Sequence, residues 1–303
     1  MLLSVLAVAG AALCYGASAV LQAAAVARSG RTDLTGLVGG LARDPRYLCG
    51  LLLVAGGFLL SVVAIRALPL FVVQAGRASS LGVTALLAAL VLGTRLHHRE
   101  KLALGGVGIG LVAVALAATP QGPAVVPGAV RWAVLAAAVV LAALTLAAAR
   151  TRPSARTATL VAALAGSCFG LLALAARVLG PIALPDVLTD PSAYAVGVAS
   201  AAGLVAGALA LQRGSVVAVT TTMVATEAVL GSLLGLAVGD RPADGLARLA
   251  AVGFVVTVGS ALLLARFGAP DTPTPAPSAG STRSNEKACD APAASTGAFP
   301  APN

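Results

Sequence analysis

The sequence has little charge, few aromatic residues and almost no lysine. Asp, Glu, Lys and Arg together make up 10% of the 303 residues, and Phe, Trp and Tyr make up 3%. Soluble domains carry roughly 25% charged residues, so a soluble globular enzyme is nearly excluded. Disorder over most of the chain is excluded because 58% of the residues are hydrophobic, whereas disordered chains have low hydrophobicity. An integral membrane protein remains.

Motifs that would indicate an enzyme, a cofactor or a metal site are missing as well. No Gly-rich phosphate loop precedes a lysine, and the four cysteines lack the spacing of a metal site. Glu227 is the only carboxylate inside a long apolar run, so a paired-carboxylate mechanism lacks its second member. The net charge of +9 comes from scattered arginines without a basic stripe, which argues against nucleic acid. We therefore expect no enzymatic activity, no cofactor and no metal site.

Long apolar runs dominate the chain. A membrane-spanning helix needs about 20 mostly apolar residues. The sequence predicts an all-α, polytopic membrane helix bundle in which Arg66 and Pro69 separate one tight helical hairpin. The predicted spans are 2–26, 47–66, 68–92, 102–118, 131–149, 158–179, 193–212, 214–238 and 246–267.

The arginines and lysines between these runs predict an orientation. Nine spans put 14 positive charges on the side of the C-terminal tail and 5 on the other side, and Arg77 lies within a span. Lys and Arg concentrate on the cytoplasmic side, so we expect the tail inside and the N-terminus outside. The Pro-rich segment 268–303 is predicted to be a disordered cytoplasmic tail. The Arg-rich, Ala-rich composition is typical of a high-GC bacterium, which favours a bacterial plasma membrane.

The chain contains an internal repeat. Asp44-Pro45 recurs as Asp190-Pro191, and Gly57, Gly93 and Arg95 recur at the same offset of 146 as Gly203, Gly239 and Arg241. Upstream, Cys14-Tyr15-Gly16 recurs as Cys168-Phe169-Gly170 at an offset of 154. We predict four-helix repeats over 1–118 and 158–267, joined by a linker helix and cytoplasmic loop over 119–157. The first helix of the second repeat is the sixth span, so it crosses the membrane in the opposite direction to the first span. The two repeats are therefore inverted relative to each other, which is a common plan in secondary transporters.

The segment from Ala67 to Leu116 carries an ordered set of motifs. These are Leu68-Pro69-Leu70, Gln74, Val83-Thr84-Ala85-Leu86-Leu87, Leu92-Gly93-Thr94-Arg95-Leu96 and the glycines Gly105, Gly106, Gly108 and Gly110. This order resembles the drug/metabolite transporter (EamA-like) superfamily, whose members place a Pro-containing helix before a Gly-Glu-Arg-Leu-like helix end and then a Gly-rich helix. The resemblance covers about residues 1–267, and it implies transport of a small solute.

Two departures from that pattern leave an alternative open. Thr94 stands where the common motif has Glu, and nine spans replace the usual ten. The nine-span plan is closer to the NIPA-type magnesium transporters of the same superfamily. Mg²⁺ prefers oxygen ligands, usually carboxylates, and Arg77 beside Glu227 would repel a cation. A cation pathway is therefore the alternative to a solute carrier.

Arg77 and Glu227 are the two charged residues that lie deep in apolar runs. Counted from the predicted outer ends of 68–92 and 214–238, they lie about 13 Å and 16 Å deep at 1.5 Å per residue. Buried intramembrane charges indicate function by default. Polar residues at helical spacing share faces with them, and we predict that these faces line a central cavity. The candidate substrate or coupling residues are Arg77, Glu227, Gln74, Thr84, Thr220, Ser80 and Thr226.

Several roles fit this arrangement. Glu227 could take up a proton, Arg77 could hold an anionic group, or the two could form a static ion pair. The main prediction is a secondary-active transporter of a small solute or metabolite by alternating access, with proton-coupled export as one form. A non-transporting scaffold and a lipid flippase stay open. The expected partners are the lipid bilayer and a small-molecule or ion substrate, and a homodimer is left open. Arg177, near a span end, is expected to snorkel towards water.

Overall fold

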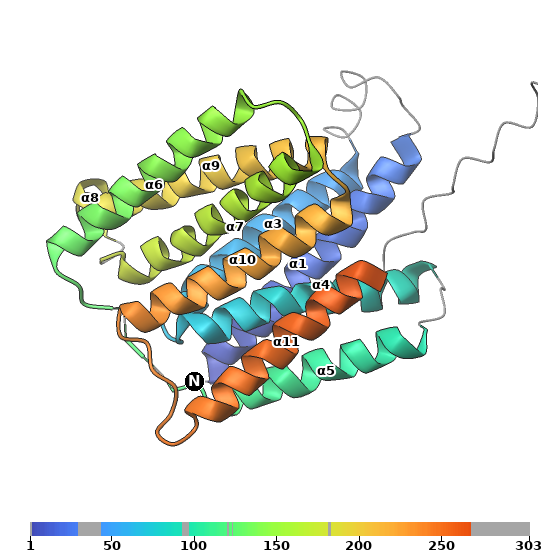
Figure 1. The fold of residues 1–303 in the computed structure, drawn as a ribbon. Coiled ribbons are helices and arrows are strands. Elements are labelled where there is room, and N and C mark those ends of the chain that lie inside the picture. Colours follow the sequence, from blue (N-terminus) through green and yellow to red (C-terminus); the bar gives the residue numbers. More distant parts are fainter. Residues whose placement is uncertain are drawn as a thin grey trace, which may run out of the picture. The chain divides into compact units, whose positions relative to one another are not determined.

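Helices form the whole of the ordered architecture in the part of the chain that the structure describes. This computed structural model describes residues 2–29, 44–92, 97–119, 121–122, 124–180 and 183–267 (Figure 1). The all-α prediction is confirmed, and each predicted apolar run is one long helix. The helices are α1 (Leu2–Ser29), α3 (Pro45–Ile65), α4 (Leu70–Leu92), α5 (His98–Leu116), α6 (Gly128–Ala149), α7 (Ala155–Val178), the short α8 (Leu184–Thr189), α9 (Pro191–Arg213), α10 (Val216–Ala237) and α11 (Ala247–Phe267).

Eight of these helices are long and apolar enough to cross a membrane, which makes the chain a multi-pass membrane protein. The exception among the nine long helices is α5. Its first turn carries Arg99, Glu100 and Lys101, so the apolar part runs only from Leu102 to Leu116. Large apolar side chains point outward from the spanning helices, as a lipid surface requires; Leu52 is one of them, with 72% of its surface exposed. The ninth crossing stays a prediction.

Two long helices begin in the same way, at the two Asp-Pro pairs. The Asp44 carboxylate accepts a hydrogen bond of 2.8 Å from the backbone N–H of Arg46, and Pro45 occupies the first turn of α3. The Asp190 carboxylate accepts a bond of 2.8 Å from the N–H of Ser192, and Pro191 opens α9. An Asp side chain satisfies an orphan N–H at a helix start, and Pro is tolerated there because it needs no donor partner.

Packing follows the same order in the two predicted repeats. Helix α1 packs against α3 and α4, and α7 packs against α9 and α10. A Cβ at Gly57 of α3 would lie 3.2 Å from the Cβ of Cys14 and 3.3 Å from the ring of Tyr15. A Cβ at Gly203 of α9 would lie 3.2 Å from the Cβ of Cys168 and 3.1 Å from the ring of Phe169. Helix α6 lies outside this scheme and packs against α9 and α7.

The corresponding helices of the two predicted repeats run antiparallel where they meet. Along the seam between α4 and α10, Leu70 lies against Gly235 and Gln74 lies against Gly231. Helices α5 and α11 also meet in opposite directions, as Gly106 contacts Ser260 and Gly110 contacts Gly253 and Thr257. Antiparallel contact between equivalent helices is the geometry that inverted repeats produce. The repeat boundaries themselves stay a prediction, and the tail 268–303, Gly93, Thr94 and Arg95 lie outside the described residues.

Candidate functional site

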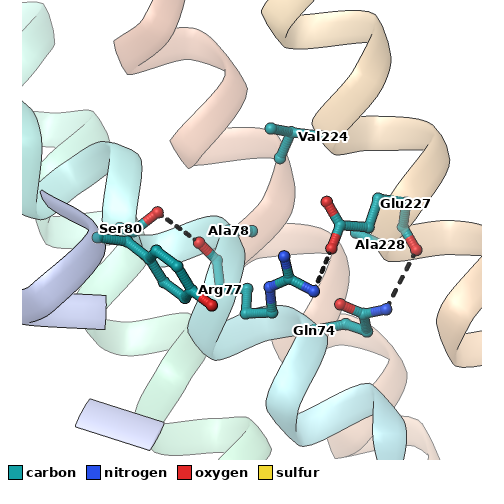
Figure 2. A pocket seen from close by; sticks show the side chains of 8 residues that line it. Gln74, Arg77, Ala78, Ser80, Val224, Glu227 and Ala228 are labelled. Atoms are coloured by element: carbon teal, nitrogen blue, oxygen red, sulfur yellow. Dashed lines mark hydrogen bonds and ion pairs between the residues drawn. The ribbon is translucent and has the colours of Figure 1, made fainter. Parts of the chain in front are cut away.

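An ion pair joins α4 to α10 near the middle of α10. Arg77 of α4 and Glu227 of α10 point towards each other, and Arg77 Nη1 lies 2.5 Å from Glu227 Oε1 (Figure 2). The side chain of Glu227 is 10% exposed and that of Arg77 is 22% exposed. The contact brings the charges together without the alignment of a hydrogen bond, so Glu227 Oε1 has no donor partner among the described residues. The sequence predicted this proximity from the depths of the two residues.

Gln74 lies one turn before Arg77 and faces the same helix. Its side chain is 1% exposed, and its Nε2 donates a hydrogen bond of 3.3 Å to the backbone carbonyl of Glu227 (Figure 2). The other amide atom, Oε1, is buried without a partner in the described part of the chain. An unpaired buried carbonyl costs roughly 1–3 kcal/mol, so this position favours a water or a solute that donates a hydrogen bond.

Tyr15 of α1 covers the other side of the arginine. The guanidinium carbon of Arg77 lies 5.6 Å from the centre of the Tyr15 ring, within the range of a cation–π contact. The Ser80 hydroxyl donates to the carbonyl of Arg77 at 2.7 Å, which ties it to its own helix. Arg77 is therefore held by a carboxylate and by an aromatic face.

These groups surround a cavity of about 170 Å³. That volume holds several water molecules or a small solute. Its walls combine one cation, one carboxylate, an amide and a hydroxyl with apolar surface, which is the usual make-up of a small-molecule site. The lining residues are Tyr15, Gln74, Arg77, Ala78, Ser80, Val224, Glu227 and Ala228.

Four of the seven candidate residues line this cavity, and three do not. Arg77, Glu227, Gln74 and Ser80 lie on its walls, whereas Thr84, Thr220 and Thr226 are absent from them. Thr84 and Thr220 were predicted on the faces that line the cavity and Thr226 beside them, and their part in binding or coupling stays a prediction. Thr84 and Thr220 each lie seven residues from the ion pair, about 10 Å along the helix.

Thr226 is turned to a different neighbour. It is adjacent to Glu227 in sequence, so its side chain points about 100° away around α10. A Cβ at Gly166 of α7 would lie 2.9 Å from the Cβ of Thr226, which places this side chain in the α7–α10 contact. Thr84 is also engaged locally, because its hydroxyl donates to the carbonyl of Ser80 at 2.8 Å.

The sequence predicted no role for Ala78, Val224 or Ala228, and for Tyr15 it favoured helix packing over a gate on the solute path. Ala78 and Ala228 carry no chemical signal, because small residues are common throughout the apolar runs. Tyr15 had a signal in its place within the repeated Cys-Tyr-Gly and Cys-Phe-Gly motifs. Its counterpart Phe169 packs on Gly203 as Tyr15 packs on Gly57, but only Tyr15 is among the residues that line this cavity.

A second ion pair lies at the end of the bundle. Arg177 at the end of α7 is only 2% exposed, so the expectation that it snorkels is wrong. Its Nε and Nη2 donate to Asp240 Oδ1 at 3.1 and 2.8 Å, and its Nη1 donates to the carbonyl of Ile65 at 2.7 Å. Buried guanidinium groups need such partners, and the sequence did not reveal that Asp240 and the end of α3 supply them.

The described residues contain no group of three or more His, Cys, Asp and Glu side chains that could hold a metal ion. His97 precedes the first residue of α5, and both it and His98 are exposed. The chemistry that this site offers therefore comes from its own charged and polar side chains. These can exchange a proton at Glu227, bind an acidic group at Arg77 and accept hydrogen bonds at Gln74.

The family resemblance of the chain receives no further support from comparison with known proteins. No family model, no curated protein and no solved structure matches the chain.

Proposed function

We propose that this protein is a secondary-active transporter of a small solute, working by alternating access. The observation that carries the proposal is the polar cavity around Arg77 and Glu227, between two antiparallel helices at corresponding places in the predicted repeats. Substrate sites of transporters built from inverted repeats lie at the repeat interface near the bilayer midplane. The resemblance of residues 1–267 to the drug/metabolite transporter superfamily agrees with this proposal, and we propose a bacterial plasma membrane as its location.

The cavity favours a solute that carries both an acidic group and a hydrogen-bond donor. An acidic group competes with Glu227 for the planar donors of Arg77. A cationic or N–H group of the same solute takes the place of Arg77 at Glu227 and reaches the unpaired Oε1 of Gln74. Such a solute replaces both halves of the ion pair, so the site never holds an uncompensated charge.

A proton on Glu227 opens the same pair. Protonation removes the carboxylate charge, and Arg77 then needs another anion. This competition links proton uptake to solute binding, so an imposed pH gradient drives flux in this proposal. A fixed ion pair in a scaffold needs no cavity beside it, and a cation pathway conflicts with the guanidinium that faces the cavity.

Flux in proteoliposomes tests the proposal. Purified protein is reconstituted, and uptake of labelled amphoteric, anionic and cationic solutes is measured with and without a pH gradient. We expect Glu227→Gln to abolish the response to the gradient, and Arg77→Ala to lower flux by about tenfold or more, since each change removes a charge from the site.

Thr222→Val is the matched control for these two variants. Thr222 lies on the same helix as Glu227, and its hydroxyl donates to the carbonyl of Ala218 outside the cavity. We expect its flux to equal that of the wild type. If Glu227→Gln and Arg77→Ala insert normally and transport at the wild-type rate, the proposed site is wrong; if no solute of any class moves, the carrier proposal is wrong.

A further inference from the structure

The buried pair of Arg177 and Asp240 connects four helix ends that belong to both predicted repeats. Besides the bonds between the two side chains, Arg177 Nη1 binds the carbonyl of Ile65 at the end of α3. Asp240 Oδ2 accepts a bond of 2.6 Å from the N–H of Leu70 at the start of α4. The network therefore ties the ends of α7 and α10 to the α3–α4 hairpin.

Gln121 completes the network. Its Oε1 accepts from Arg177 Nη2 at 3.2 Å, and its Nε2 donates to the carbonyl of Arg241 at 2.6 Å. Its backbone N–H donates to the carbonyl of Ala67 at 3.0 Å. Each of the three guanidinium nitrogens thus has a partner, and both charged side chains are about 2% exposed. A fully paired buried network stabilises one arrangement of the helix ends. Loss of any partner would leave a buried charge with neither a partner nor water.

The seam between this network and the cavity is closed. Residues 70–76 of α4 are all buried. A Cβ at Gly235 would lie 2.7 Å from the Cβ of Leu70, and one at Gly231 would overlap the Gln74 side chain. The start of α4 and the end of α10 lie side by side in Figure 1 (cyan and orange), and only glycine allows this approach. Among the described residues, this close packing covers Arg77 from this end.

The opposite end of the same seam differs. Beyond Ser80, α4 is half-exposed at most of its described positions, and so is α10 between Thr220 and Thr226. The two ribbons diverge towards that end in Figure 1. There, α4 packs with α5 and α11 through Gly82 and with α1 through Gly16, whereas α10 packs with α7 through Gly166. The cavity is thus closed at the network end and less covered at the other.

The predicted repeats differ in sequence at the residues that form the network, which agrees with the difference between the two ends of the α4–α10 seam. At the offset of 146, Asp240 corresponds to Thr94, and at the offset of 154, Arg177 corresponds to Ala23. Neither counterpart can form a charged network. In a carrier built from two inverted repeats, the inward-open and outward-open states exchange the conformations of the repeats. A network present at only one end of the bundle therefore stabilises one of these states over the other.

We propose that Arg177 and Asp240 form a latch that keeps the cavity closed at the α4 start and sets the side from which the site is reached at rest. This inference rests on the proposed carrier function. Solute binding at Arg77 opens the latch because Gln74 and Leu70, one and two turns away on the same helix, connect the cavity to Asp240.

Thiol accessibility tests the latch without requiring a known solute. Cys14, Cys49, Cys168 and Cys289 are replaced by Ala, and Leu70→Cys is introduced as a reporter in the closed seam. In proteoliposomes, a membrane-impermeant charged thiol reagent modifies this cysteine only when the seam opens. We expect Asp240→Asn to raise the modification rate by about tenfold or more, because the buried Arg177 loses its counter-charge in the closed state.

Asp244→Asn is the matched control, since Asp244 is an exposed acid four residues further along the same loop. We expect it to leave the rate unchanged. A second reporter, Ala261→Cys in the buried α11 contact, stays unreactive in a folded variant. If Asp240→Asn exposes both reporters, it has unfolded. Arg177→Lys then decides, because it keeps the charge but loses the guanidinium fork, and it must raise the Leu70→Cys rate with the Ala261→Cys reporter still protected.

Equal Leu70→Cys rates in the wild type and in every folded latch variant would overturn the latch. This outcome is separate from failure of the carrier. Flux without a change in thiol accessibility leaves the carrier standing and removes the latch. A change in accessibility without flux of any solute keeps the seam opening and removes the carrier function on which the latch depends.

Discussion

At Gly166, α7 approaches α10 so closely that no side chain fits. A Cβ there would lie 2.4 Å from the carbonyl oxygen of Met223 and 3.0 Å from the backbone nitrogen of Glu227. Both are backbone atoms, which cannot rotate away. Gly166, together with Gly170 one turn further along α7, therefore allows α10 with Glu227 to lie close to α7.

We expect Gly166→Ala to lower the free energy of unfolding by about 1–3 kcal/mol, as for other overpacked contacts, and to reduce flux as Glu227 shifts. Gly197→Ala on α9 is the control, because nothing lies within 4 Å of a Cβ there and Ala favours a helix. Melting in detergent compares the two. Equal melting temperatures would mean that α7 and α10 separate at little cost.

Some residues of the candidate site could be predicted from the sequence, and others could not. Arg77 and Glu227 were predictable because a charge deep in an apolar run is costly and rare. Thr84 was not distinguishable from Ser80, because hydroxyls in helices often bond to a carbonyl three or four residues earlier. The hydroxyl bonds of both residues follow that pattern. Polarity in a helix therefore does not identify a cavity wall.

At the scale of helices, the aspartates of the two Asp-Pro pairs make different contacts. Asp44 is half-buried and caps α3 through the N–H of Arg46. Asp190 caps α9 and also accepts from the N–H of Gly180 at 2.9 Å and from Arg131 Nη1 at 3.0 Å. Both aspartates cap a helix, and Asp190 in addition binds residues outside its own helix.

We expect Asp44→Ala to cost about 1 kcal/mol of stability, the usual value of a cap, and Asp190→Ala to cost about 2–4 kcal/mol, since it also strands the partners of a charged group. Thermal unfolding of the two variants in the same detergent measures the difference. Equal losses would show that the bonds to Gly180 and Arg131 add nothing.

The same carboxylate gives a pH dependence. Burial alone would raise the pKa of Asp190, but the hydrogen bonds from Gly180 and Ser192 and the charge of Arg131 outweigh it and lower that pKa. The stabilisation by Asp190 is therefore complete above the ordinary pKa of about 4, and it is lost as the pH falls below that value. We expect the wild type to lose more stability than Asp190→Asn over this acid range, and parallel curves would contradict the assignment.

At the scale of the whole molecule, the number of crossings decides on which side each terminus lies. Nine crossings place the termini on opposite faces, whereas the eight helices that meet the length and composition of a span would place them on the same face. The open element is α5, whose charged first turn shortens its apolar part. Its extensive packing against the spanning helix α11 favours the ninth crossing.

We expect a fluorescent protein fused after Asn303 to fluoresce in the cytoplasm, and an N-terminal peptide tag to be cut by protease added to spheroplasts. The positive charges support this orientation. Arg66, Arg131 and Arg177, three of the five on the predicted outer side, donate to carbonyls or carboxylates of the bundle. Protection of the tag together with fluorescence would leave only eight crossings.

Local composition was enough to locate the long helices and to select Arg77 and Glu227, because hydropathy and the cost of a buried charge act on each segment separately. The short helix α8 was not predicted, because its six residues contain no long apolar run. Contacts between distant segments decided the rest. Tyr15 came to the cavity, the three threonines were excluded from it, and Arg177 was buried against Asp240, since each outcome depends on which helices pack together.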